Sequence, residues 1–161
     1  MSTRTLIWES LLDAEMNVKY WGYMARRFVV REKWLKAALA ITTSSVLLSL
    51  PLWQRFPSGP VYLAVVNAAL ALSLPILNYS ESIETMANLR GSWSQLRIEY
   101  DRLWQRAENT EACSKDEFEN EFRLLRERTI QLSVTETRLP NDRKLVQRCQ
   151  QEVCRARGLA G

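Results

Sequence analysis

The side chains best suited to binding a ligand are cations near the C-terminus. Lys144, Arg148 and Arg155 fall along one side of a predicted helix, and Arg143 lies beside them. Guanidinium groups make paired hydrogen bonds to phosphate, so these four residues predict a signal-binding site for a phosphate-bearing molecule. Two other uses remain open: pairing with the acidic segment at residues 117–127, and binding to anionic lipid head groups.

Catalysis is not expected from this composition. The 161 residues contain no histidine, which removes the commonest general base and the usual neutral zinc ligand. The cysteines Cys113, Cys149 and Cys154 are odd in number and lack the spacing of a zinc site or a disulfide framework. No glycine-rich phosphate loop or nucleophile with its base is recognisable. We therefore expect a protein that is not an enzyme, without metal or cofactor.

A second group of polar side chains lies inside two apolar runs. In each run the polar and small residues share one face of a helical wheel. They would either hydrogen-bond across a helical hairpin or line a pore, with Leu74 as a constriction and Pro75 as a hinge. A pore would require an oligomer, because two helices enclose no lumen. The predicted pore-lining residues are Thr42, Ser45, Ser49, Asn67, Ala71, Leu74 and Asn78.

The two apolar runs have the length of membrane spans. Residues 35–53 and residues 61–79 each comprise nineteen positions, and only Lys36 carries a charge. A helix of this length measures about 28 Å, close to the hydrocarbon core of a bilayer. The alternative is a pair of buried helices in a soluble protein. The short connection at residues 54–60 predicts an antiparallel transmembrane hairpin.

Basic residues orient this hairpin. Five lysines and arginines precede the first run between Arg26 and Lys36, and Arg90 and Arg97 follow the second, whereas Arg55 is alone in the loop. Because positively charged flanks remain on the cytoplasmic side, both termini are predicted to be cytoplasmic.

Helical periodicity continues on both sides of the hairpin. Apolar residues alternate at spacings of three and four before it and after it, as in a heptad seam. A Ser-x-x-Glu capping box at Ser114 predicts a third helix, and Asn141 predicts the cap of a fourth. The first seam is Leu11, Ala14, Val18, Trp21, Ala25 and Phe28; the second is Met86, Leu89, Trp93, Leu96, Tyr100 and Leu103.

These elements predict an all-α membrane protein, a two-helix transmembrane hairpin with long helical cytoplasmic extensions and two further C-terminal helices. The expected layout is an N-terminal helix at 1–34, spans at 35–53 and 61–79 around a loop at 54–60, a stalk helix at 80–112 and a helical region at 113–161.

The pattern resembles the SLATT proteins, bacterial two-transmembrane effectors of nucleotide-sensing anti-phage systems. The resemblance lies in an aromatic and arginine-rich helix around Trp21, Tyr23, Arg26, Arg27 and Trp34, followed by two spans and a helical tail. It implies a homo-oligomer in the lipid bilayer of the bacterial inner membrane. It also implies control by a nucleotide or oligonucleotide from a cognate nucleotidyltransferase.

Two functions are therefore expected as alternatives. The first is an oligomeric pore-forming effector of anti-phage defence, which depolarises the membrane and causes growth arrest or cell death (abortive infection). The second is a non-conducting, membrane-anchored coiled-coil adaptor that recruits a partner enzyme.

Overall fold

The computed structural model describes residues 3–44, 58–108 and 115–159, and leaves undescribed the side chains at 73–77, 115 and 116. This part of the chain folds into helices: α1 (Thr3–Thr42), α3 (Gly59–Leu77), α4 (Tyr79–Glu108), α5 (Lys115–Glu136) and α6 (Arg143–Ala156). The all-α part of the prediction is confirmed. The chain divides into two compact units, with unit 1 comprising Met1–Met24 and Thr85–Gly161, and unit 2 comprising Ala25–Glu84.

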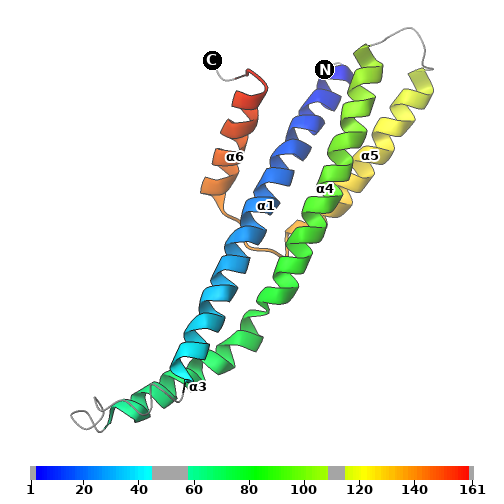
Figure 1. The fold of residues 1–161 in the computed structure, drawn as a ribbon. Coiled ribbons are helices and arrows are strands. Elements are labelled where there is room, and N and C mark those ends of the chain that lie inside the picture. The colour runs from blue at the N-terminus through cyan, green and yellow to red at the C-terminus, as the bar shows by residue number, and fades with distance from the viewer. Residues whose placement is uncertain (1–2, 45–57, 109–114, 160–161) are drawn as a thin grey trace. The chain divides into compact units, whose positions relative to one another are not determined.

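Unit 1 is a helical bundle with an apolar core. The first part of α1 lies beside α4 and α6, and α5 lies on the other side of α4 (Figure 1). All six residues of the predicted second seam are buried, from Met86 to Leu103, and so are Leu11, Ala14 and Trp21 of the first. Each large apolar side chain buried in this way contributes about 1.5–3 kcal/mol. The heptad pattern therefore identified the core of this unit.

The short helix α6 closes the bundle. Its apolar line of Leu145, Cys149 and Val153 is buried. The predicted cap is wrong by one residue, because the Asp142 side chain accepts a hydrogen bond from Leu145 N at 3.1 Å and so caps the helix. Both residues carry a suitable short polar side chain, and Asn141 is engaged elsewhere. The capping box at Ser114 lies outside the described residues.

Unit 2 contains the end of α1, helix α3 and the first residues of α4. Asn78 adopts a left-handed backbone conformation with φ +39°, which ends α3 at Leu77. The stalk helix predicted at 80–112 corresponds to α4 and is separate from α3. Helix α1, in contrast, is continuous from Thr3 to Thr42. Phe28 and Tyr79 make an edge-to-face ring contact at 5.7 Å, and Ser80 donates to Glu32 at 3.1 Å.

The transmembrane hairpin is not supported. Among the residues that the structure describes, no helix combines the length and apolar character needed to cross a bilayer. Residues 35–42 of the first predicted span belong to α1, a helix otherwise dense in charge, and residues 45–53 lie outside the described residues. The second predicted span has Asn67 in the middle of α3. The predicted two-span membrane fold and inner-membrane location are therefore corrected, and with them the idea of an ion-conducting pore.

Candidate functional site

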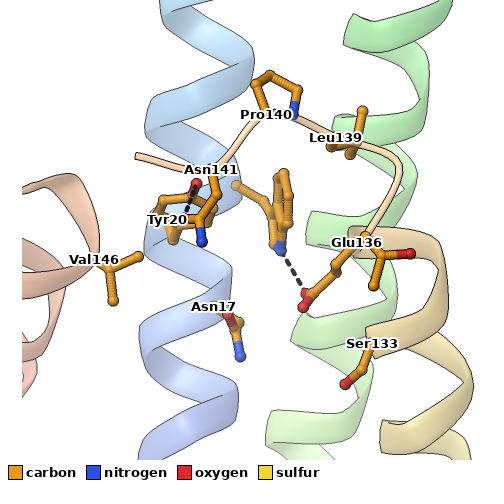
Figure 2. A pocket seen from close by; sticks show the side chains of 10 residues that line it. Asn17, Tyr20, Ser133, Glu136, Leu139, Pro140, Asn141 and Val146 are labelled. Carbon is orange, nitrogen blue, oxygen red and sulfur yellow. Dashed lines mark hydrogen bonds between the residues drawn. The ribbon is translucent and has the colours of Figure 1, made fainter. Parts of the chain in front are cut away.

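The candidate site is a cavity in unit 1 where the α5–α6 connection passes α1 (Figure 2). Its volume is about 410 Å³. Polar side chains enter it from α1 and α5, and the connection adds two apolar residues. The lining residues are Asn17, Tyr20, Trp21, Ser133, Glu136, Thr137, Leu139, Pro140, Asn141 and Val146.

Glu136 at the end of α5 binds two buried indoles. Its Oε1 atom accepts hydrogen bonds from Trp21 Nε1 at 2.8 Å and from Trp93 Nε1 at 2.6 Å. Both tryptophan side chains are almost fully buried, so neither indole N–H has ready access to water. Hydrogen bonds to an ionised acceptor are stronger than neutral ones. One carboxylate thus joins α1, α4 and α5 at the wall of the cavity.

Tyr20 fixes the opposite wall. Its hydroxyl accepts a hydrogen bond from the Asp142 backbone N–H at 3.0 Å and donates to Asn141 Oδ1 at 3.3 Å (Figure 2). Burial raises the pKa of the Tyr20 hydroxyl above its ordinary value. The hydroxyl therefore stays protonated and can make both bonds. Tyr20 attaches the residues that begin α6 to α1.

This arrangement holds its polar groups in hydrogen bonds between neighbouring elements. The Glu136 atom Oε1 is already shared by two donors, and the Tyr20 hydroxyl is held in its neutral form. No cluster of three potential metal ligands occurs within residues 3–44, 58–108 and 115–159. The chemistry that the site supports is recognition or conformational coupling of α5 to α6.

The predicted signal-binding residues of α6 differ in their contacts within the structure. Arg148 donates from Nε to Glu152 at 3.0 Å and stacks over the Tyr23 ring at 5.5 Å. Glu152 also accepts from the Tyr23 hydroxyl at 3.1 Å. The Arg148 guanidinium holds the pKa of the Glu152 carboxyl below its usual range. Arg148 is thus engaged within unit 1.

The remaining cations of that prediction, Arg143, Lys144 and Arg155, are exposed along α6. The acidic helix α5 pairs with α4 through Arg106–Glu121 and through Arg128–Glu99, the latter at 2.9 Å. Arg148 therefore pairs with Glu152 of its own helix, and its described contacts include no acidic residue of α5. Signal binding by these α6 residues stays a prediction.

Two residues of the predicted pore-lining set contact each other. Asn67 Nδ2 donates to the Thr42 carbonyl oxygen at 2.9 Å, and the Thr42 hydroxyl hydrogen-bonds Asn67 Oδ1. This is the expected hydrogen bonding between two helices, here α1 and α3. Asn78 instead donates to Glu81 at 3.0 Å at the start of α4, and Ala71 is exposed.

The other members of that set cannot be placed. Ser45 and Ser49 lie outside the described residues. Leu74 and the predicted hinge Pro75 belong to α3, but their side chains are outside the described part. Within the predicted pore-lining set, the structure places Thr42 and Asn67 in contact.

Sequence reasoning missed the residues of the cavity in unit 1. Tyr20 precedes Asn141 by 121 positions in the chain, and no short motif connects Tyr20 to Glu136 or Asn141. The available signal was indirect: Trp21 and Trp93 occupy core positions of the two seams. A buried indole N–H normally finds an acceptor.

Comparison with known proteins adds no relative to this description. No family model matches the chain, and neither a curated protein nor a solved structure is significantly similar to it. The similarity to SLATT proteins stays a prediction from the sequence.

Proposed function

We propose that the chain is a non-catalytic helical adaptor that assembles with copies of itself through unit 2 and displays unit 1 to a partner. The pore hypothesis depended on membrane-crossing helices and is not carried forward. The adaptor proposed here keeps the partner recruitment of the second alternative and leaves out its membrane anchor. The observation that carries the proposal is the exposed apolar surface of unit 2.

Unit 2 exposes apolar side chains at heptad spacing. Four exposed apolar residues of α3 follow one another at spacings of four, three and four: Val61, Val65, Ala68 and Leu72. Half-buried Leu63, Asn67 and Leu70 lie on the opposite side of the helical wheel. The Asn67 bonds to Thr42 show that this second side faces α1. The exposed seam is thus free for a further helix.

The end of α1 repeats the same pattern. Val30, Trp34 and Ile41 are exposed, and Ala37 completes the spacing of four, three and four. Trp34 has 73% of its surface accessible. Every buried residue in the described part of the chain belongs to unit 1, and the side chains of unit 2 that the structure describes are half-buried or exposed. Unit 2 presents two apolar seams of the kind by which helices associate.

A second copy of unit 2 is the occupant that fits this surface. The two seams carry six large exposed apolar side chains, and at about 100 Å² each they offer on the order of 600 Å², approaching the roughly 800 Å² per partner of a standard interface. No charged residue occurs between Arg55 and Glu81. A seam without charge has no electrostatic preference for a charged partner. The same apolar seam on a second copy is complementary to it, as in a two-fold symmetric interface. Assembly then raises avidity for whatever unit 1 binds.

Light scattering after size exclusion tests the assembly. We expect the wild-type protein to elute with a mass that is a multiple of 18.7 kDa. The double variant Val65→Glu/Leu72→Glu places two charges on the α3 seam and should give the single-chain mass. Ile130→Glu/Val134→Glu is the matched control, because both residues are exposed apolar positions on α5 in unit 1.

Two results would contradict the proposal. One is a wild-type protein with the mass of one chain at every concentration. The other is equal loss of assembly in the α5 control, which would move the interface to unit 1. Circular dichroism of each variant separates loss of assembly from loss of folding.

A further inference from the structure

A second cavity of unit 1 is lined by three arginines. It has a volume of about 350 Å³ and lies between Leu11 of α1, one face of α4 and the end of α6. Arg97 and Arg102 come from α4, and Arg157 is the C-terminal cap of α6. The only carboxylate in the lining is Asp101, which accepts a hydrogen bond from Gln105 at 3.1 Å. Among the lining residues, three positive charges therefore face one negative charge.

Arg97 is the unusual member of this cluster. Its Nε atom is buried from solvent and has no hydrogen-bond acceptor. A buried donor without an acceptor is destabilising, and guanidinium donors are charged. The buried Nε is out of reach of a molecule in the cavity, but the Arg97 side chain lines the cavity and places its positive charge at the wall.

Arg157 is already oriented. Glu15 accepts from its Nε at 3.0 Å and from its Nη2 at 2.9 Å, and the guanidinium lies over the Trp8 ring at 5.5 Å. Glu15 uses only part of the donor fork, because a guanidinium has five N–H groups. Glu15 therefore holds the Arg157 guanidinium in place and leaves other N–H groups of it available for a further acceptor.

We propose that this cavity binds a phosphate group, free or carried by an organic molecule. Phosphate oxygens match the planar donor forks of arginines, and two or more forks around one cavity fix the geometry of a tetrahedral anion. The volume is in the range of small-ligand sites. Ile98, which is partly exposed, adds apolar surface beside the arginines, where the organic part would lie. The site differs from the basic residues predicted on α6.

Tryptophan fluorescence provides the assay, because Trp8 contacts Arg157. Inorganic phosphate, pyrophosphate and AMP are titrated at constant ionic strength, with chloride as the reference anion. We expect saturable binding of at least one of them. Tighter binding of AMP assigns the site to an organic phosphate; equal or tighter binding of inorganic phosphate assigns it to the free anion.

Two arginine variants locate the site. Arg97→Met and Arg102→Met keep most of the aliphatic stem and remove the charge. Each should weaken binding by roughly tenfold to a hundredfold, the range for loss of a charged hydrogen bond. Arg123→Met is the matched control, since Arg123 is exposed on α5 and does not line the cavity. Arg143→Met separately tests the basic residues predicted on α6.

The proposal is overturned if none of the three anions gives saturable binding. It is also overturned if both α4 variants, folded by circular dichroism, bind as the wild type does. Loss of binding in Arg143→Met comparable to that in Arg97→Met would place the anion on the surface of α6 instead.

Discussion

Replacing Glu136 by alanine should destabilise unit 1 through two tryptophans. The substitution leaves Trp21 Nε1 and Trp93 Nε1 without the acceptor that they share at 2.8 and 2.6 Å. An unpaired buried donor costs about 1–3 kcal/mol, so two such donors cost roughly 2–6 kcal/mol. The adjacent cavity lets water reach part of this site, which reduces the cost. We expect a loss of about 3 kcal/mol, a decrease in Tm of roughly 6–12 °C for a chain of this size.

Thermal and urea unfolding followed by circular dichroism measure this loss. Glu127→Ala is the matched control, because Glu127 is exposed on the same helix. Glu136→Gln keeps a neutral acceptor and should lie between the control and Glu136→Ala. In a double-mutant cycle, Trp93→Phe should cost less in the Glu136→Ala background, with a coupling energy of about 1–3 kcal/mol. Equal stability of Glu136→Ala and Glu127→Ala would refute the reasoning.

Three further predictions concern the same bundle. Asp142→Ala should lower the free energy of unfolding by about 1 kcal/mol through loss of the α6 cap, and Asn141→Ala by less, as measured by urea denaturation; the reverse order would mean that Asn141 is the cap. Burial raises the pKa of Tyr100, so its contribution to stability is complete below its ordinary pKa of 10.0 and is lost as pH rises toward the folded value. Tyr100→Phe should therefore make Tm fall less steeply between pH 9 and pH 11 (about one unit on either side of that ordinary pKa), and an unchanged slope would contradict this. Cys149 is buried and Cys154 partly exposed, so peptide mass spectrometry should find Cys154 alkylated well before Cys149; equal rates would show that α6 does not pack as described.

Local periodicity explains what could be predicted of the fold. The α4 seam from Met86 to Leu103 was predicted in full, because a spacing of three and four places successive residues on one helical face whatever the partner is. The cap of α6 was placed one residue early because Asn141 and Asp142 are both good caps. Which of them serves depends on Tyr20, which takes up the Asn141 side chain.

The incorrect membrane prediction followed from reading length and charge without helix boundaries. Residues 35–42 continue a helix that starts at Thr3, and Asn78 ends α3 with a left-handed residue. Neither boundary can be seen in a hydropathy pattern. Several of the same apolar residues, among them Ile41, Val61 and Leu72, are exposed on the seams of unit 2.

The cavities could not be predicted because they depend on tertiary packing. Glu136 meets Trp21 across 115 residues of sequence, and Arg157 meets Glu15 across 142. The basic pattern on α6 was visible, but the partners of Arg148 were not. Conversely, Arg97 was visible only as a charge flanking an apolar run, and its unpaired Nε is a property of the folded bundle.

Hydrogen–deuterium exchange at two protein concentrations, read peptide by peptide, tests the self-assembly of unit 2 most directly. We predict that raising the concentration slows exchange in α3 and in residues 30–41 of α1, while α5 and α6 exchange at unchanged rates. Exchange in α3 that is independent of concentration, with the mass remaining at 18.7 kDa, would contradict assembly through these seams.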